Sequence, residues 1–252
     1  MIESKIEYSI ATPIPALQDF VESLWMIRNH SDDSKEIVVL PDGKFDIIFS
    51  YSLSEPFNIM QMGLGSKPDQ NSFPPRLVMF AVSFKLLAIE YLLHTKAGSL
   101  LDHAQSLPSD FWGVTKNDLD DFDHFCEKVS AKMLTLIEHN IDRRKQKLFE
   151  LIYASNGSLT VKELSEKVNW SSRQINRYFN EQFGISLKAY CNILRFRASL
   201  PQIKEGKLFP EQNFTDQTHF IKEIKRFSGV VPKELSKNQN DRFILLSALP
   251  KK

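Results

Sequence analysis

The side chains best suited to chemistry in this sequence lie at the start of one predicted helix. Its exposed positions there carry Ser172, Arg173, Asn176 and Arg177. None of these is acidic, arginine can make a bidentate contact to guanine, and asparagine can do so to adenine. Ser171 comes directly before the helix, where it and the free N–H groups of the first turn can face a phosphate. The pattern is typical of a recognition helix, whose N-terminal residues meet base edges in the major groove of DNA.

Two capping boxes define the helices that would position these side chains. The segment Thr160–Glu163 has the form Thr-x-x-Glu and Ser171–Gln174 has the form Ser-x-x-Gln, so each marks a helix start. Asn169 lies in the turn between the two helices and tolerates the left-handed conformation that such a turn often needs. Gly184 is placed to end the second helix. Two short capped helices joined by a tight turn predict a helix-turn-helix. The positions expected to be buried are Val161, Leu164, Val168, Ile175, Phe179 and Phe183.

A weak internal repeat predicts a second helix of the same kind. A shift of 45 residues aligns Ser171 with Asp216, Arg177 with Lys222, Phe179 with Ile224, Gly184 with Gly229 and Lys188 with Lys233. Asp216 is an N-cap residue, so a helix is expected directly after it. The residues expected on the exposed face of this helix are Gln217, Thr218, His219 and Lys222. An ordinary solvated helix is the alternative for either one, but two such helices in tandem favour DNA binding.

Basic residues are concentrated in the same half of the chain. The 252 residues have a formal net charge of +1, but the part from Arg143 onward holds 21 Lys and Arg against 10 Asp and Glu, and the rest holds 11 against 21. This asymmetry indicates that only the second half meets a polyanion, although solvated surface charge would also explain it. The candidate phosphate contacts are Lys162, Lys167 and Lys188.

The C-terminal part of the chain resembles the AraC/XylS family of bacterial transcription regulators. The resemblance covers about Leu159 to Leu235. The matching residues are the run 169–179, Gly184, Ile185, Ser186, Tyr190, Arg195 and the segment 214–229 with Pro232, which contains the family signature at Asp216, Gln217, His219, Phe220, Arg226, Phe227 and Gly229. It implies two helix-turn-helix units, joined by a long helix, that enter successive major grooves. Upstream, Trp25, Leu40–Gly43 and Phe84 look like the N-terminal domains of one AraC-like subgroup, and family members often carry a cupin-like barrel that binds a small effector.

Three features depart from the family's pattern. Asn169 stands where Gly is usual in the turn, and Leu187 stands where Pro is usual. The stretch that normally holds the first helix of the second unit is reduced to Lys207–Asn213 and contains Pro210. Pro201 is expected to interrupt the preceding linker helix. The second unit is therefore expected to be shortened.

The region before residue 113 is predicted to be mixed but strand-rich. From Leu17 to Trp25, apolar residues fall at i, i+3, i+4, i+7 and i+8, which predicts an amphipathic helix. Pro41-Asp42-Gly43 between two apolar runs predicts a hairpin. Further strands are expected at 57–60 and 77–84.

A helical pattern begins at Asn117 and continues, in two helices, to Ala154. The first helix carries an apolar stripe of Leu119, Phe122, Cys126, Val129, Met133, Leu136 and Ile137. Packing of this stripe against its own domain is favoured over a dimer seam. The expected fold is α+β, with a strand-rich N-terminal sensing or dimerisation domain, a helical connector, an all-α tandem helix-turn-helix with a shortened second unit, and a tail. The corresponding bounds are 1–113, 114–158, 159–238 and 239–252.

No pattern of catalytic residues emerges from the sequence. No His-x-His occurs, and Asp121, Asp123 and His124 fit a solvated helix face better than a metal site. Cys126 and Cys191 fit buried, reduced thiols. No enzymatic activity, cofactor or metal is therefore expected. The start of the sequence shows no signal peptide and no apolar stretch suits a membrane span, so a cytoplasmic location is expected.

The leading hypothesis is a sequence-specific transcription regulator that binds double-stranded DNA and is controlled through its N-terminal domain. A small-molecule effector and a homodimer are further partners that this hypothesis allows. One alternative is a protein-interaction module that keeps the helix-turn-helix scaffold but has lost DNA binding. The other is a small-molecule enzyme whose helical tail is only structural.

Overall fold

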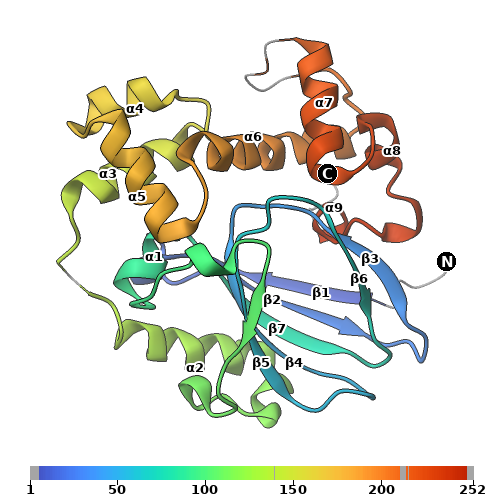
Figure 1. Ribbon diagram of the computed structural model, residues 1–252. Coiled ribbons are helices and arrows are strands. Elements are labelled where there is room, and N and C mark those ends of the chain that lie inside the picture. The colour runs from blue at the N-terminus through green and yellow to red at the C-terminus, as the bar shows by residue number, and fades with distance from the viewer. Residues whose placement is uncertain (1–5, 139, 211–213, 215, 249–252) are drawn as a thin grey trace.

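The fold is α+β, as predicted, with strands in the N-terminal region and helices in the C-terminal region (Figure 1). This computed structural model describes residues 6–138, 140–210, 214 and 216–248. The strands are β1 (Ile6–Ala11), β2 (Val21–Asn29), β3 (Lys35–Val39), β4 (Phe45–Tyr51), β5 (Asn58–Met62), β6 (Asp69–Phe73), β7 (Val78–Phe84) and β8 (Ala104–Ser106). Six of them form an antiparallel sheet in the order β1-β2-β7-β4-β5-β8, and β3 pairs with β6 in a separate two-stranded sheet.

The predicted helix over Leu17 to Trp25 is wrong. Only a single 3₁₀ turn, η1 (Pro15–Leu17), precedes strand β2. β2 pairs with β7 from Val21 to Arg28 and with β1 from Leu24 to Asn29, so its backbone groups bond within the sheet. The register shifts between Val21 and Ser23, and this irregularity moves buried residues off strict alternation. The resulting spacing imitates that of a helix.

The predicted hairpin at Pro41-Asp42-Gly43 is also wrong, although the strands on either side of it form. β3 pairs with β6, whereas β4 pairs with β5 and β7. The Pro-Asp-Gly segment therefore connects the two sheets. Gly43 has φ +75° and lies against Tyr190, so a contact distant in the sequence determines this turn.

Helix α2 covers one face of the large sheet. It spans Phe122–Leu134 and packs the Phe125 ring edge-on to Phe49 and Phe80, with ring centroids 5.4 and 5.3 Å apart. Every residue of the predicted apolar stripe is buried or packed against the core. The expected use of this stripe, packing within its own chain, is therefore confirmed.

The remaining helices complete the C-terminal region and its connections. They are α1 (Leu86–Tyr91), α3 (Arg143–Ala154), α4 (Val161–Val168), α5 (Ser172–Phe183), α6 (Leu187–Lys204), α7 (Gln217–Ser228), α8 (Pro232–Lys237) and α9 (Ile244–Ala248). Single 3₁₀ turns are η2 (Gly98–Leu100), η3 (Phe111–Gly113), η4 (Lys116–Leu119) and η5 (Gln239–Asp241). In Figure 1, α6 runs above the sheet and α2 lies below it.

Pro201 does not interrupt α6, which continues to Lys204. A proline inside a helix removes one hydrogen bond and crowds the preceding turn. Here Phe196, Leu200 and Ile203 on either side of the proline are buried, and this packing keeps the segment helical.

The segment after α8 folds back onto the small sheet. The Val38 N–H donates to the Arg242 carbonyl at 2.7 Å, and Val38 forms a parallel bridge with Phe243. Phe243 and Leu246 are buried. Residues 239–248, predicted to belong to a C-terminal tail, thus take part in the folded structure.

Candidate nucleic-acid interface

Helices α4 and α5 form as the capping boxes predicted. Thr160 Oγ1 accepts the Glu163 N–H at 3.2 Å, while the Glu163 carboxylate accepts the Thr160 N–H at 2.7 Å. Ser171 and Gln174 exchange the same pair of bonds at 3.3 and 3.1 Å. Asn169, with φ +51°, ends α4 in the left-handed conformation. The turn is thus set by local hydrogen bonds, and the Ser171 hydroxyl is engaged in the cap.

The N-terminal half of α5 presents the predicted basic residues to solvent. Arg173 and Arg177 are exposed, and the Arg177 side chain is 71% exposed. Its nearest carboxylate, Glu181, lies 3.9 Å away in a surface pair of little energetic weight. Ser172 and Asn176, which were also expected to be exposed, are half-buried instead. The Asn176 Nδ2 donates to the Ser172 carbonyl at 3.0 Å, which leaves its Oδ1 and a second amide proton for other contacts. The predicted phosphate contacts Lys162, Lys167 and Lys188 are all exposed.

Helix α7 begins and ends where the internal repeat predicted. The Asp216 carboxylate accepts the His219 N–H at 2.8 Å, and Gly229 ends the helix with φ +78°. Gln217, Thr218 and Lys222 are exposed, as expected. His219 is instead half-buried, with its ring 5.8 Å from that of Phe214, so the expectation that it is exposed was wrong. It lies on the flank of the helix that faces the preceding loop.

The expected shortening of the second unit agrees with the described residues between α6 and α7. Residues 205–210, 214 and 216 contain no helix. Part of the predicted stretch Lys207–Asn213, namely 211–213, lies outside the described residues. In the described part of the chain, α7 follows α6 without a helix equivalent to α4.

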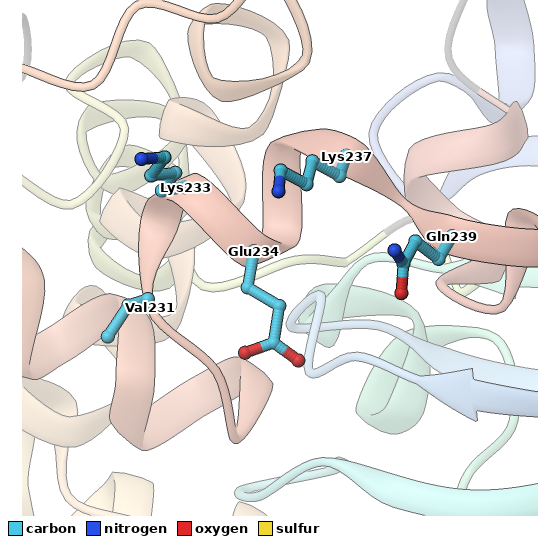
Figure 2. Close-up of a pocket in the computed structure, with 5 residues that line it drawn as sticks. All are labelled: Val231, Lys233, Glu234, Lys237 and Gln239. Carbon is cyan, nitrogen blue, oxygen red and sulfur yellow. The ribbon is translucent and has the colours of Figure 1, made fainter.

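Lys233, which the repeat pairs with Lys188, was not among the predicted phosphate contacts. Both lysines occupy the second position of a helix, α6 or α8, and both are exposed. Lys233 lines a shallow pocket along α8 together with Val231, Glu234, Lys237 and Gln239 (Figure 2). Glu234 pairs with Arg242 at 2.9 Å. The repeat was the signal that could have identified Lys233.

The C-terminal end of α5 is fixed to the N-terminal region. The Gln182 Nε2 group donates to the Thr95 carbonyl at 2.7 Å, and the Ala97 N–H donates to the Gln182 carbonyl at 2.9 Å. Gly98 and Gly184 lie so close that a Cβ on Gly184 would be 2.5 Å from the Gly98 carbonyl oxygen. One end of α5 is therefore held by η2, while its other end faces solvent.

Helix α6 is joined to the sheet by a partly buried group of charges that we call the Glu22 charge cluster: Glu22, Asp42, Lys44, Asp46 and Arg197. The Glu22 carboxylate lies 2.8 Å from Lys44 Nζ and 2.7 Å from Arg197 Nη2. Burial alone would raise the pKa of Glu22, but Lys44 and Arg197 outweigh it and lower this pKa to about 2. Burial and the nearby Arg197 lower the pKa of Lys44 to about 8. Burial raises the pKa of Asp42. Burial and the nearby Asp42 together raise the pKa of Asp46 to about 7.

Tyr190, one of the residues that carried the family resemblance, lies beside this cluster. Its hydroxyl donates to the Gly43 carbonyl at 3.1 Å and lies 3.2 Å from the Tyr153 hydroxyl. The Tyr190 side chain is fully buried. Its two hydroxyl contacts connect the Pro-Asp-Gly segment to α6 and α3. Arg195 is half-buried on α6 and hydrogen-bonds to Asn192.

Comparisons with known proteins gave one match to a domain family and matches to solved structures. Residues 9–106 match the model of a domain of unknown function, DUF6597. Over nearly its whole length the chain is similar to the crystal structure of ToxT from Vibrio cholerae O395, at 13% identity and a TM-score of 0.48, covering 97% of this chain and 99% of that one. The structure of unsaturated fatty acid-bound ToxT from Vibrio cholerae strain SCE256 is similar at 13% identity and a TM-score of 0.46, covering 90% and 96%. No curated protein matches the sequence.

Groups that could support other chemistry are few. Within the residues described, no three His, Cys, Asp or Glu side chains are grouped so as to hold a metal ion. The exposed His124 of α2 lies 3.4 Å from the buried Asp118 of η4. Cys126 and Cys191 are free thiols, and burial raises the pKa of each to about 12, which makes them poor nucleophiles. None of the described helices is long and apolar enough to cross a membrane.

Proposed function

We propose that this protein is a sequence-specific DNA-binding transcription regulator of the AraC type and not an enzyme. The observation that carries the proposal is the exposed N-terminal half of α5, where Arg173 and Arg177 project from a helix whose other end is fixed. A rigid helix with basic and amide side chains at its N-terminal end suits the major groove, where such side chains read base edges. The lack of acidic residues in this half avoids repulsion from phosphates.

Each predicted contact has a role in this proposal. Arg173 and Arg177 read guanine, and Asn176 reads adenine through the amide atoms that its bond to Ser172 leaves free. The first-turn N–H groups beside Ser171 face a phosphate, while the Ser171 hydroxyl stays in the cap with Gln174. Ser172 lies on the face of α5 that meets the bases. The lysines that contact the DNA backbone and fix the register are Lys162, Lys167 and Lys188.

Helix α7 is proposed to add a second set of contacts. The residues involved are Gln217, Thr218, His219 and Lys222. Its cap and its exposed face repeat those of α5, which supports a similar role. The described residues between α6 and α7 hold no helix, so the helices that position α7 in this proposal are α6 and α8.

We propose that the N-terminal region controls DNA binding through the contacts at η2 and at the Glu22 charge cluster. A small-molecule effector or a second copy of the chain that moved η2 or the sheet would also move α5 and α6, which these contacts hold. Ligand control of this kind requires that the effector or second copy bind one arrangement of the helices more tightly than another.

Site selection with the full chain tests the proposal. The full chain is used because the core is continuous between the sheet and the C-terminal helices. We expect an enriched motif from a random DNA pool, and affinity for it should fall by roughly a few hundredfold or more between 50 and 200 mM salt. Arg173→Ala should weaken binding to the best site by about 1–3 kcal/mol and relax the preference at one base pair. Lys132→Ala, exposed on α2, is the control and should change neither.

Two results would overturn the proposal. If Arg173→Ala binds every site as tightly as the parent, α5 does not read bases. If no motif is enriched and binding does not respond to salt, the protein-interaction module becomes the better explanation. The absence of a helix in the described residues between α6 and α7 is the observation that favours this second function.

A further inference from the structure

An isoleucine is exposed on the face of α7 that carries the proposed DNA contacts. Ile221 lies next to Lys222, and its neighbours one turn away on the same face are Thr218 and Lys225. All four are exposed, with Ile221 at 36%. The apolar side of α7 is a different one, formed by Phe220, Ile224 and Phe227, which are buried. Ile221 therefore adds an aliphatic group to an otherwise polar and basic surface.

The internal repeat places Ile221 in the position that Asn176 has on α5. The two helices begin after equivalent side-chain caps, Ser171 and Asp216, and end at equivalent left-handed glycines. Counting from these caps, Asn176 and Ile221 are both the fifth residue. The two helices thus present different chemistry at the same point of the same surface: an amide on α5 and an aliphatic group on α7.

The chemistry of isoleucine restricts what it can recognise in DNA. It has no hydrogen-bond donor or acceptor, so it cannot read the polar edges of bases. Among the groups exposed in the major groove, the 5-methyl of thymine is the apolar one, and aliphatic side chains contact it. The β-branched side chain is also stiff, so its methyl groups are held in place before binding.

We infer that Ile221 is a specificity-determining residue that reads a thymine through its 5-methyl group. The inference rests on the proposed function and deepens it, because it gives α7 a base preference distinct from that of α5. Its position beside Lys222 and Thr218 predicts that this thymine lies in the part of the selected motif that α7 covers.

Replacement of thymine by deoxyuridine tests the inference, because it removes only the 5-methyl group. In the motif selected by the full chain, each thymine is replaced in turn and the Kd is measured for the parent and for Ile221→Ala. At one or two positions, uracil should weaken parent binding by about threefold to fivefold, the effect expected for one buried methyl group. At the same positions it should weaken Ile221→Ala by less than about 1.5-fold. Lys222→Ala is the matched control: it should bind more weakly overall but keep the full sensitivity to uracil.

A second variant tests the equivalence of the two helices. Ile221→Asn reproduces the residue of α5, so its selected motif should change from thymine to adenine at the same position. The inference is overturned if the parent binds its motif but no uracil penalty disappears in Ile221→Ala, or if the α7 part of the motif contains no thymine. In either case the proposed function stands. If the parent shows no salt-sensitive DNA binding at all, both the function and the inference fail.

Discussion

Replacing Glu22 by glutamine should weaken the attachment of α6 to the sheet. Glu22 pairs with Lys44 at 2.8 Å and with Arg197 at 2.7 Å, and the Lys44 side chain is only 2% exposed. Removing one partner of a buried ion pair costs roughly 3–5 kcal/mol, because the remaining charge is left uncompensated. The Glu22 side chain is 28% exposed, so we expect the lower end of that range, about 3 kcal/mol. The pKa of Glu22, lowered from 4.5 to about 2, corresponds to a free energy of similar size.

Urea unfolding of the parent and of Glu22→Gln measures this loss at neutral pH. Because the folded-state pKa of Glu22 lies below its ordinary value, its stabilisation is complete above pH 4.5 and is lost as the pH falls toward 2. The difference between parent and variant should therefore shrink across this window. Glu166→Gln, at an exposed position of α4, is the matched control and should change stability by less than about 0.5 kcal/mol.

The double variant Glu22→Gln/Lys44→Met should recover a large part of the loss, because it removes the buried ammonium together with its partner. A loss below about 1 kcal/mol for Glu22→Gln at neutral pH would refute the reasoning. The reasoning would also be refuted if Glu22→Gln lost as much stability at about pH 3 as at neutral pH, because the carboxylate charge would then contribute nothing to stability.

Two further changes test other parts of the structure. Burial and the neighbouring Asp42 raise the pKa of Asp46 from 3.8 to about 7, although the Ser83 hydrogen bond, Lys44 and Arg197 oppose this rise. The folded state therefore keeps a proton that the unfolded chain releases. Stability should fall as the pH rises across this window, by at most about 1.4 kcal/mol per pH unit, and urea unfolding of Asp46→Asn should show a weaker dependence; an unchanged slope would exclude Asp46 as the cause. Gly184→Ala should cost about 2 kcal/mol or more, because φ is +70° and the new Cβ would lie 2.5 Å from the Gly98 carbonyl oxygen. Gly206→Ala, with φ +78° and nothing within 4 Å, should cost only about 1 kcal/mol, and equal losses would contradict a tight contact at Gly98.

Local chemistry made the candidate interface predictable from the sequence. The caps at Thr160, Ser171 and Asp216 are formed within three residues of each helix start, so their hydrogen bonds can be inferred from spacing alone. The left-handed Asn169 and Gly184 follow from the same short-range rules. These signals predicted the bounds of α4, α5 and α7 and the exposure of their basic residues, but not the partial burial of Asn176 and His219.

Contacts between distant segments account for what the sequence did not predict. The segment with Leu17 and Trp25 has apolar spacing that suits a helix, but pairing with β1 and β7 makes most of it a strand. The Pro-Asp-Gly segment resembles a hairpin turn, but the position of Gly43 depends on Tyr190. The Glu22 charge cluster joins Glu22 to Arg197, residues that no local pattern connects.

The return of the chain onto β3 makes the order of synthesis matter for this protein. The Val38 N–H bonds to the Arg242 carbonyl, so this edge of the small sheet is covered by residues made much later. At about 5–20 residues per second, a ribosome adds Arg242 on the order of 10–40 s after Val38. During that time the nascent strand has an open edge, and open edges are templates for pairing with other chains. This edge of β3 therefore gains its partner only when η5 and α9 have been made.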